Sequence, residues 1–161
     1  MTNPRNAELI MDVLTGLQRR KGFLGLKVET FNLIVTSRRL VFAAVSSGLM
    51  KEAIMQARRE AKGHGAGFMG QWGAQLGWMK VLERRFFLIA VNAFLEQFPG
   101  SFSLLHTDVR SIVARSDEDD EGGRVTHEVL IETAGEKLRF QLTHGTADEA
   151  REVLGQHIAN V

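Results

Sequence analysis

Two stretches near the start of the chain alternate apolar and polar residues with the period of two that is typical of half-buried strands. Residues 29–36 and 39–46 each place three apolar side chains on one face, which are Phe31, Leu33 and Val35 in the first stretch and Leu40, Phe42 and Ala44 in the second. The short polar segment between them predicts an antiparallel hairpin. An apolar run at residues 9–18 predicts an earlier strand, and residues 19–25 predict the turn that follows it.

The same alternation returns in the last third of the chain. Residues 102–115 predict one or two strands with a break near Thr107 and Asp108, and residues 124–133 and 136–144 predict two strands joined by a tight turn. Thr146 and Glu149 have the spacing of a capping box, which predicts a closing helix. The inward stripe of that helix is expected to comprise Ala150, Val153, Leu154, His157, Ile158 and Val161.

Between these regions the apolar period changes to that of a helix. Leu49, Ala53, Ala57 and Ala61 recur every four residues, and charged side chains such as Glu52 and Arg59 take the opposite side. We therefore expect a single α+β domain over residues 1–161, with an antiparallel sheet, a C-terminal helix, and a helical insertion at residues 48–99.

The chain resembles a prokaryotic pleckstrin-homology-like (PH-like) domain. Residues 31–45 are similar to the family's strand–turn–strand signature, in which an apolar strand ends in Thr and a basic turn precedes the return strand. Residues 106–116 resemble a later strand, and residues 133–142 resemble the last hairpin before the C-terminal helix. The match covers residues 9–47 and 101–161, and the insertion departs from a simple domain of this family.

This resemblance implies a bent antiparallel sheet, or half-open barrel, that is closed at one end by the helix and binds partners without catalysis. Members of the family recognise anionic lipid headgroups, peptides or other proteins. The matching basic region offers Arg19, Arg20, Lys21 and Lys27 as candidate contacts to an anion or a lipid headgroup. Glu29 stands where the phosphoinositide-binding members carry a closing arginine, which argues against specific inositol-phosphate recognition.

A G-x-G-x-x-G motif at Gly65, Gly67 and Gly70 raises the question of nucleotide binding. A dinucleotide fingerprint needs a preceding strand and an acidic residue about twenty positions later, and the sequence offers neither. The segment instead carries a stripe at helical spacing, formed by Phe68, Trp72, Leu76 and Met79. This stripe either packs within its own domain or forms a surface for self-association or for a membrane, and of these two surfaces self-association is favoured.

The acidic segment at residues 117–128 places Asp117, Asp119, Glu121, Gly122 and Glu128 at positions of a calcium loop. Strand-like runs flank it in place of helices, so we interpret it as a charged hairpin loop and expect no metal site. The five histidines lack the spacing of a helix-paired metal site.

The composition of the chain narrows the classes of function that remain. The chain has no cysteine and no G-x-S-x-G motif, so we expect neither an enzyme nor a cofactor. Its longest apolar run is shorter than a membrane span and its start lacks the pattern of a signal peptide, so we expect a cytoplasmic protein with no transmembrane segment.

The charges divide unevenly along the chain. Residues 1–99 carry 14 basic and seven acidic side chains, whereas residues 100–161 carry six and 12. A nucleic-acid partner is not expected, because aromatic residues do not alternate with the basic ones on one strand face. The leading hypothesis is a non-catalytic adaptor whose insertion mediates self-association or partner association. The alternative is a peripheral module that binds anionic membranes through Arg19, Arg20, Lys21 and Lys27 together with the stripe at residues 64–79. An enzyme ranks third.

Overall fold

The structure is a computed structural model that describes residues 8–46, 91–118 and 123–158, together with Gly48, Glu52, Met55 and Arg59. The chain divides into two compact units, one comprising residues 1–44 and 91–161 and the other residues 45–90. The four separate residues fall in the second unit, where each is helical and exposed, as the period of four predicts for Glu52 and Arg59. The fold below is that of the first unit.

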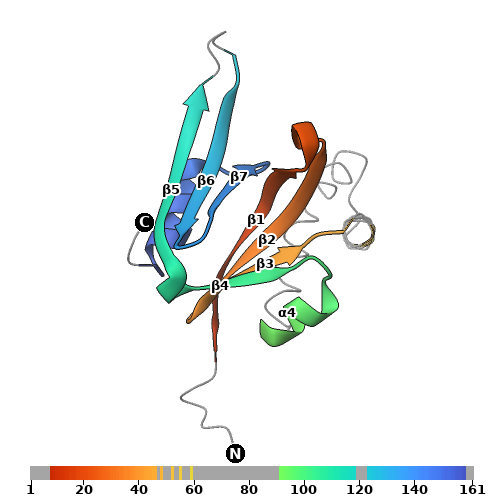
Figure 1. The fold of residues 1–161 in the computed structure, drawn as a ribbon, viewed down its shortest axis with the longest axis vertical. Coiled ribbons are helices and arrows are strands. Elements are labelled where there is room, and N and C mark those ends of the chain that lie inside the picture. Colours follow the sequence, from red (N-terminus) through yellow and green to blue (C-terminus); the bar gives the residue numbers. More distant parts are fainter. Residues whose placement is uncertain are drawn as a thin grey trace, which may run out of the picture. The chain divides into compact units, whose positions relative to one another are not determined.

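Seven strands form one antiparallel sheet in the order β4-β3-β2-β1-β7-β6-β5 (Figure 1). The strands are β1 (Ile10–Lys21), β2 (Lys27–Thr36), β3 (Arg39–Ala44), β4 (Phe102–Leu105), β5 (Val109–Glu118), β6 (Val125–Thr133) and β7 (Lys137–Leu142). The helical elements are η2 (Phe23–Gly25), α4 (Val91–Gln97), η3 (His106–Asp108) and α5 (Ala147–Gly155). The expected antiparallel α+β architecture is confirmed at this level, as are the two hairpins and the break near Thr107.

Strand β1 belongs to both halves of the sheet and bends where it passes from one to the other. Gly16 lies in a register shift against β2 and has a φ of +76°, a conformation that glycine adopts without steric cost. Its N–H donates to Asn32 Oδ1 at 3.2 Å, and its carbonyl accepts from the Thr143 N–H and hydroxyl, each at 2.9 Å. Gly16 therefore connects β1 to β2 and to Thr143, the residue that follows β7.

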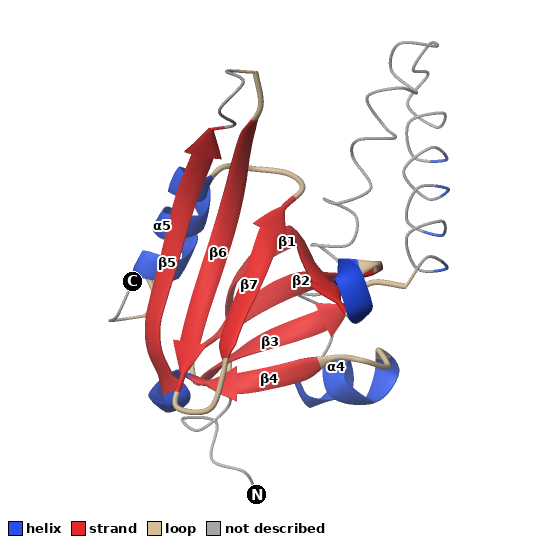
Figure 2. Ribbon diagram, turned by 45° about the horizontal axis from the view of Figure 1, so that its top comes forward, coloured by secondary structure: helices blue, strands red, loops and turns tan. Residues whose placement is uncertain are grey.

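The two halves of the sheet share little pairing. Among the described residues β1 pairs with β7 at two positions, Leu17 with Leu142 and Gln18 with Gln141. Figure 2 shows β1 turning away from β7 beyond this point, while β1 and β2 continue together to Lys21 and Lys27. The sheet is thus bent around β1 with one apolar face turned inward.

The turn between β2 and β3 explains why the apolar strand ends in threonine. The Thr36 hydroxyl accepts from the backbone N–H groups of Arg38 and Arg39 at 3.2 and 2.9 Å, so a side chain satisfies donors that the ladder leaves open. Glu8 receives both the Nε and an Nη hydrogen of Arg39, which ties the start of the described chain to the same turn. Arg39, a basic residue of this turn, therefore has a structural role, because it holds Glu8.

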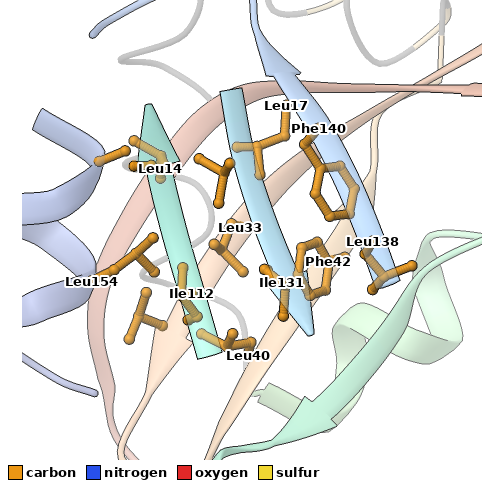
Figure 3. Close-up of a cluster of buried hydrophobic side chains, with 14 of the residues drawn as sticks. Leu14, Leu17, Leu33, Leu40, Phe42, Ile112, Ile131, Leu138, Phe140 and Leu154 are labelled. Carbon is orange, nitrogen blue, oxygen red and sulfur yellow. The ribbon is translucent and has the colours of Figure 1, made fainter. Parts of the chain in front are cut away.

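One hydrophobic core fills the inner face and reaches the C-terminal helix. Phe42 stacks on Phe140 with ring centroids 5.1 Å apart, and Phe31 meets both rings edge-on. Leu154 of α5 packs on the same cluster, beside Leu14 and Ile112 in Figure 3. The alternating residues that the sequence predicts to face inward in β2 and β3 all belong to this core or pack against it.

Helix α5 begins with the predicted capping box: the Thr146 hydroxyl accepts the Glu149 N–H, and the Glu149 carboxylate accepts the Thr146 N–H. Of the expected inward stripe, Ala150, Leu154 and Ile158 are buried, Val153 and His157 are half-buried, and Val161 lies outside the described residues. The helix also protects the edge strand, because Arg151 Nε donates to the Ala114 carbonyl of β5 at 3.0 Å.

The bend at Gly16 predicts a strong substitution effect. A Cβ at this position would lie 2.5 Å from Thr143 Oγ1, and the positive φ would strain any other side chain. We expect Gly16→Ala to lower the free energy of unfolding by about 2–3 kcal/mol, measured by urea denaturation. Gly135→Ala is the matched control, because a Cβ there meets open space, and it should leave stability nearly unchanged. Equal effects of the two variants would contradict the assigned bend.

Candidate functional site

A polar pocket of about 340 Å³ opens on the outer face of the sheet where β1 and β7 separate. Its lining comes from β1, β6 and β7 and consists of Gln18, Arg20, Thr126, Glu128, Arg139 and Gln141. The strand neighbours of these residues, such as Leu17, Val129 and Phe140, face the core, so alternation places the lining side chains on the opposite face. The volume lies in the range of small-molecule sites.

Glu128 is the acidic group of this pocket, and its residue is only 7% exposed. One carboxylate oxygen receives Arg139 Nη2, and the other receives Arg115 Nε at 3.2 Å. The hydrogen bond from Arg139 is the largest influence on Glu128 and holds its pKa below the ordinary value, although burial opposes the shift. The same contact raises the pKa of Arg139. The carboxylate thus fixes two guanidinium groups while their outer faces stay exposed.

Two glutamines, Gln18 of β1 and Gln141 of β7, lie where these two strands pair. Gln18 and Gln141 are direct partners in the β1–β7 ladder, and Gln141 is also opposite Glu128 in the β6–β7 ladder. Within the described part of the chain, neither amide side chain forms a hydrogen bond, and Arg20 forms no ion pair. The pocket therefore presents free donors and acceptors beside an unpaired guanidinium.

A second exposed feature lies at the connection between β1 and β2, drawn as the red-orange coil at the upper end of these strands in Figure 1. Phe23, Leu24 and Leu26 are 85%, 79% and 81% exposed, which is unusual for three large apolar side chains so close together. Leu24 has a φ of +60°, a left-handed conformation that leucine rarely adopts. The turn thus holds a strained leucine in solvent.

The four candidate anion contacts lie beside this turn but do not form one cluster. Arg19 donates to Glu29 at 2.8 Å, and Lys21 and Lys27 lie 3.9 and 3.6 Å from the same carboxylate. The hydrogen bond from Arg19 is the main cause that lowers the pKa of Glu29. Arg20 lies on the other face of β1, in the polar pocket.

Arg19 has a structural role. Its guanidinium lies 5.2 Å from the ring centroids of both Phe31 and Phe102, and its side chain is 18% exposed. It therefore covers the aromatic part of the core while pairing with Glu29. Of the four basic residues, Arg20, Lys21 and Lys27 keep exposed charged groups.

Other sequence predictions fall outside the described residues. These are the glycine motif, the stripe of Phe68, Trp72, Leu76 and Met79, and the centre of the acidic segment at residues 119–122. Glu128, the last position of the calcium-like spacing, lies in β6 opposite Arg115 and is already paired with two arginines. Across the described ranges, no group of three or more acidic, histidine or cysteine side chains is arranged to hold a metal ion.

Sequence reasoning missed the pocket and the apolar turn. The sequence signal of the turn is three large apolar residues between basic ones, and the prediction for residues 19–25 is only a connection between strands. The pairing of Glu128 with Gln141 follows from the tight turn between β6 and β7 once its length is known. The pairing of Gln18 with Gln141 joins distant parts of the chain, and no local signal indicates it.

The chain matches no protein-family model and no curated protein. It is similar to a solved structure described as the C-terminal domain of an unknown protein from Leishmania infantum, at 11% identity and a TM-score of 0.46. The match covers 93% of this chain and 84% of that one, and at this score it carries no argument. None of the helices in the part of the chain that the structure describes is long and apolar enough to cross a membrane.

The arginine pair around Glu128 predicts a pH-dependent contribution to stability. Because the pKa of Glu128 is lowered in the folded state, its stabilisation is present above the unfolded value of 4.5 and is lost as pH falls through the folded value. We expect Glu128→Gln to reduce the free energy of unfolding by about 1–2 kcal/mol at neutral pH and by much less once the wild-type carboxyl is protonated.

Urea denaturation of both proteins across the acid range measures this difference. Glu132→Gln is the control on the same strand, since its exposed pair with Lys137 at 3.5 Å contributes little. A loss from Glu128→Gln that does not change with pH would contradict the assigned role of the carboxylate.

Proposed function

We propose that this chain is a non-catalytic binding module with a PH-like sheet and that it docks on an anionic membrane surface through the β1–β2 turn. The single observation that carries this proposal is the exposure of Phe23, Leu24 and Leu26 between Lys21 and Lys27. Apolar side chains beside cations are what a peripheral protein needs at a lipid interface, where acyl chains accept the former and anionic headgroups the latter.

Two features of the fold support the PH-like part of the proposal. The sheet bends about β1, so that β4-β3-β2-β1 and β7-β6-β5 form its two halves. The capped helix α5 then packs on the inner face, with Leu154 and Ala150 in the common core. The resemblance of the sequence implies both features, a bent antiparallel sheet and a closing C-terminal helix.

Charge makes an anionic membrane the preferred partner for the apolar turn. Lys21 and Lys27 have side chains 58% and 72% exposed, and their distances to Glu29 are long for ion pairs. Arg19 already supplies a close hydrogen-bonded counterion to that carboxylate at 2.8 Å. The two ammonium groups are therefore free to turn toward headgroup phosphates, and each contributes about 1 kcal/mol at an anionic surface.

Leu24 adds a backbone argument for docking. A leucine in the left-handed region costs about 1–2 kcal/mol relative to a relaxed conformation. Gly22 and Gly25, which flank this part of the turn, also have positive φ values, and glycine adopts them without strain. Keeping a leucine at the strained position gives the turn an outward apolar side chain that glycine would not supply.

The second candidate function is association with another protein or with a second copy through the insertion. The stripe of Phe68, Trp72, Leu76 and Met79 favours it, since aromatic and methionine side chains at helical spacing are typical of helix–helix contacts. These residues lie outside the described part of the chain, so this hypothesis stays a prediction from the sequence.

Sedimentation with vesicles of phosphatidylcholine and phosphatidylserine tests the membrane proposal. We expect wild-type protein to pellet with anionic vesicles and to stay in solution with pure phosphatidylcholine. Lys21→Gln with Lys27→Gln should weaken the partition coefficient by about fivefold for each charge. Phe23→Ser with Leu24→Gly should weaken it by about tenfold or more while relieving the strained backbone.

The controls change the same residue types elsewhere on the sheet. Lys137→Gln removes an exposed lysine of β7, and Leu105→Ser removes an exposed leucine of β4, so neither should change the partition. Equal binding of wild-type protein to anionic and neutral vesicles would overturn the proposal. So would an unchanged partition of the Phe23 and Leu24 variant.

Light scattering tests the association hypothesis. We expect the full chain at high micromolar concentration to show a mass above that of one copy, and Trp72→Ala with Met79→Ala to return it toward a single chain, because the apolar stripe loses its largest contacts. Circular dichroism of the variant checks that folding is retained. A wild-type protein that is monomeric at this concentration would contradict self-association.

A further inference from the structure

We propose that the pocket between β1, β6 and β7 binds a small, hydroxylated, singly charged carboxylate. The proposal is independent of membrane docking, because the pocket lies on the face of β1 opposite to Lys21 and Lys27. Its volume of about 340 Å³ admits a small molecule and is too small for a protein segment with bulky side chains.

The bound group is an anion because the fixed positive charges exceed the negative ones. Arg20 and Arg139 line the pocket together with Glu128, which pairs with Arg139 and also with Arg115, an arginine outside the lining. Asp117 also acts on Arg139 through its charge. Within the lining, two arginines against one carboxylate leave one positive charge, and Arg115 and Asp117 outside the lining offset each other. A singly charged ligand neutralises this charge, whereas a dianion exceeds it.

The geometry favours a carboxylate held by guanidinium groups. Arg139 and Arg20 approach the pocket from β7 and β1, on the two sides of the gap. Glu128 holds Arg139 in place, so a second planar carboxylate meets a guanidinium whose orientation is already fixed. Arg20 has no ion pair within the described residues, and it supplies the charge that Glu128 does not neutralise.

The rest of the lining selects a polar molecule. Gln18 and Gln141 each offer an amide donor and a carbonyl acceptor that no described side chain uses. The Thr126 hydroxyl donates to the Asp117 carbonyl, and its oxygen adds an acceptor. Hydroxyl groups of a ligand satisfy both kinds of group, whereas an alkyl chain would bury them without partners. Among its lining residues the pocket holds no cysteine, serine or histidine nucleophile, so the proposal is for binding alone.

Nuclear magnetic resonance of the full chain tests the site with gluconate, a singly charged carboxylate that bears hydroxyl groups. The signals to follow are the side-chain amides of Gln18 and Gln141 and the Nε–H groups of Arg20 and Arg139. We expect saturable shifts of these signals in the millimolar range or below, at constant ionic strength. Sorbitol, which has the hydroxyl groups without the carboxylate, should produce none.

Matched substitutions locate the effect. Arg20→Gln should weaken gluconate binding by about tenfold or more, as expected when a charge-assisted hydrogen bond is lost. Arg110→Gln removes an exposed arginine of β5 that does not line the pocket, so it should leave binding unchanged. Both substitutions are at exposed positions and should keep the fold.

Three outcomes would overturn the proposal. The first is the absence of saturable shifts with gluconate, and the second is equal weakening by Arg20→Gln and Arg110→Gln. The third is tighter binding of inorganic phosphate than of gluconate, which would show that the charge balance does not select a singly charged carboxylate. Vesicle binding is measured separately, and loss of membrane docking in the Phe23 and Leu24 variant leaves this test unaffected.

Discussion

The bend of β1 at Gly16 is the constraint on which the sheet depends. If β1 paired along its whole length with both β2 and β7, the sheet would be flatter. The inner faces of its two halves would then not enclose the phenylalanine cluster. The positive φ of Gly16 and its hydrogen bonds to Asn32 and Thr143 turn the strand at the point where its pairing with β7 begins. This turn lets the inner face close over the core, and the outer pocket lies further along β1, where the pairing with β7 ends at Gln18.

Strand alternation explains why Arg19 and Arg20, which are adjacent in the sequence, have different roles. Beyond Gln18 the side chains of β1 alternate between a face that closes the core and a face that lines the pocket. Arg19 therefore covers Phe31 and pairs with Glu29, whereas Arg20 enters the pocket. The basic residues of β1 are therefore divided between the two faces of the strand, and the four candidate contacts do not lie on one surface.

Local signals in the sequence were sufficient for much of the fold. The alternation of Phe31, Leu33 and Val35 identified an inward face, and Thr146 with Glu149 identified the start of α5, because each depends on residues only a few positions apart. The order of the strands in the sheet was not predicted. It requires the pairing of β1 with β7, whose residues lie at opposite ends of the chain.

The candidate sites were harder to predict for the same reason. Glu128 fitted the spacing of a calcium loop, yet pairing within the β5–β6 hairpin places it opposite Arg115 in the ladder. Its partner Arg139 comes from a third strand, so the cluster exists only after β6 and β7 have paired. Strand pairing therefore sets the neighbours of this carboxylate, and the spacing along one segment does not indicate them.

Glu29 and Glu128 act in the same way on the two exposed surfaces. Each carboxylate holds an arginine by hydrogen bonds, and each has its pKa lowered chiefly by that arginine. A side chain already held in place loses less conformational freedom when a ligand arrives, so the entropy cost of binding falls. At Glu29 the held arginine covers the core and leaves the lysines to the solvent, whereas at Glu128 the held arginine itself faces the pocket. The same pairing thus supports an open, charged turn on one side of β1 and a preorganised pocket on the other.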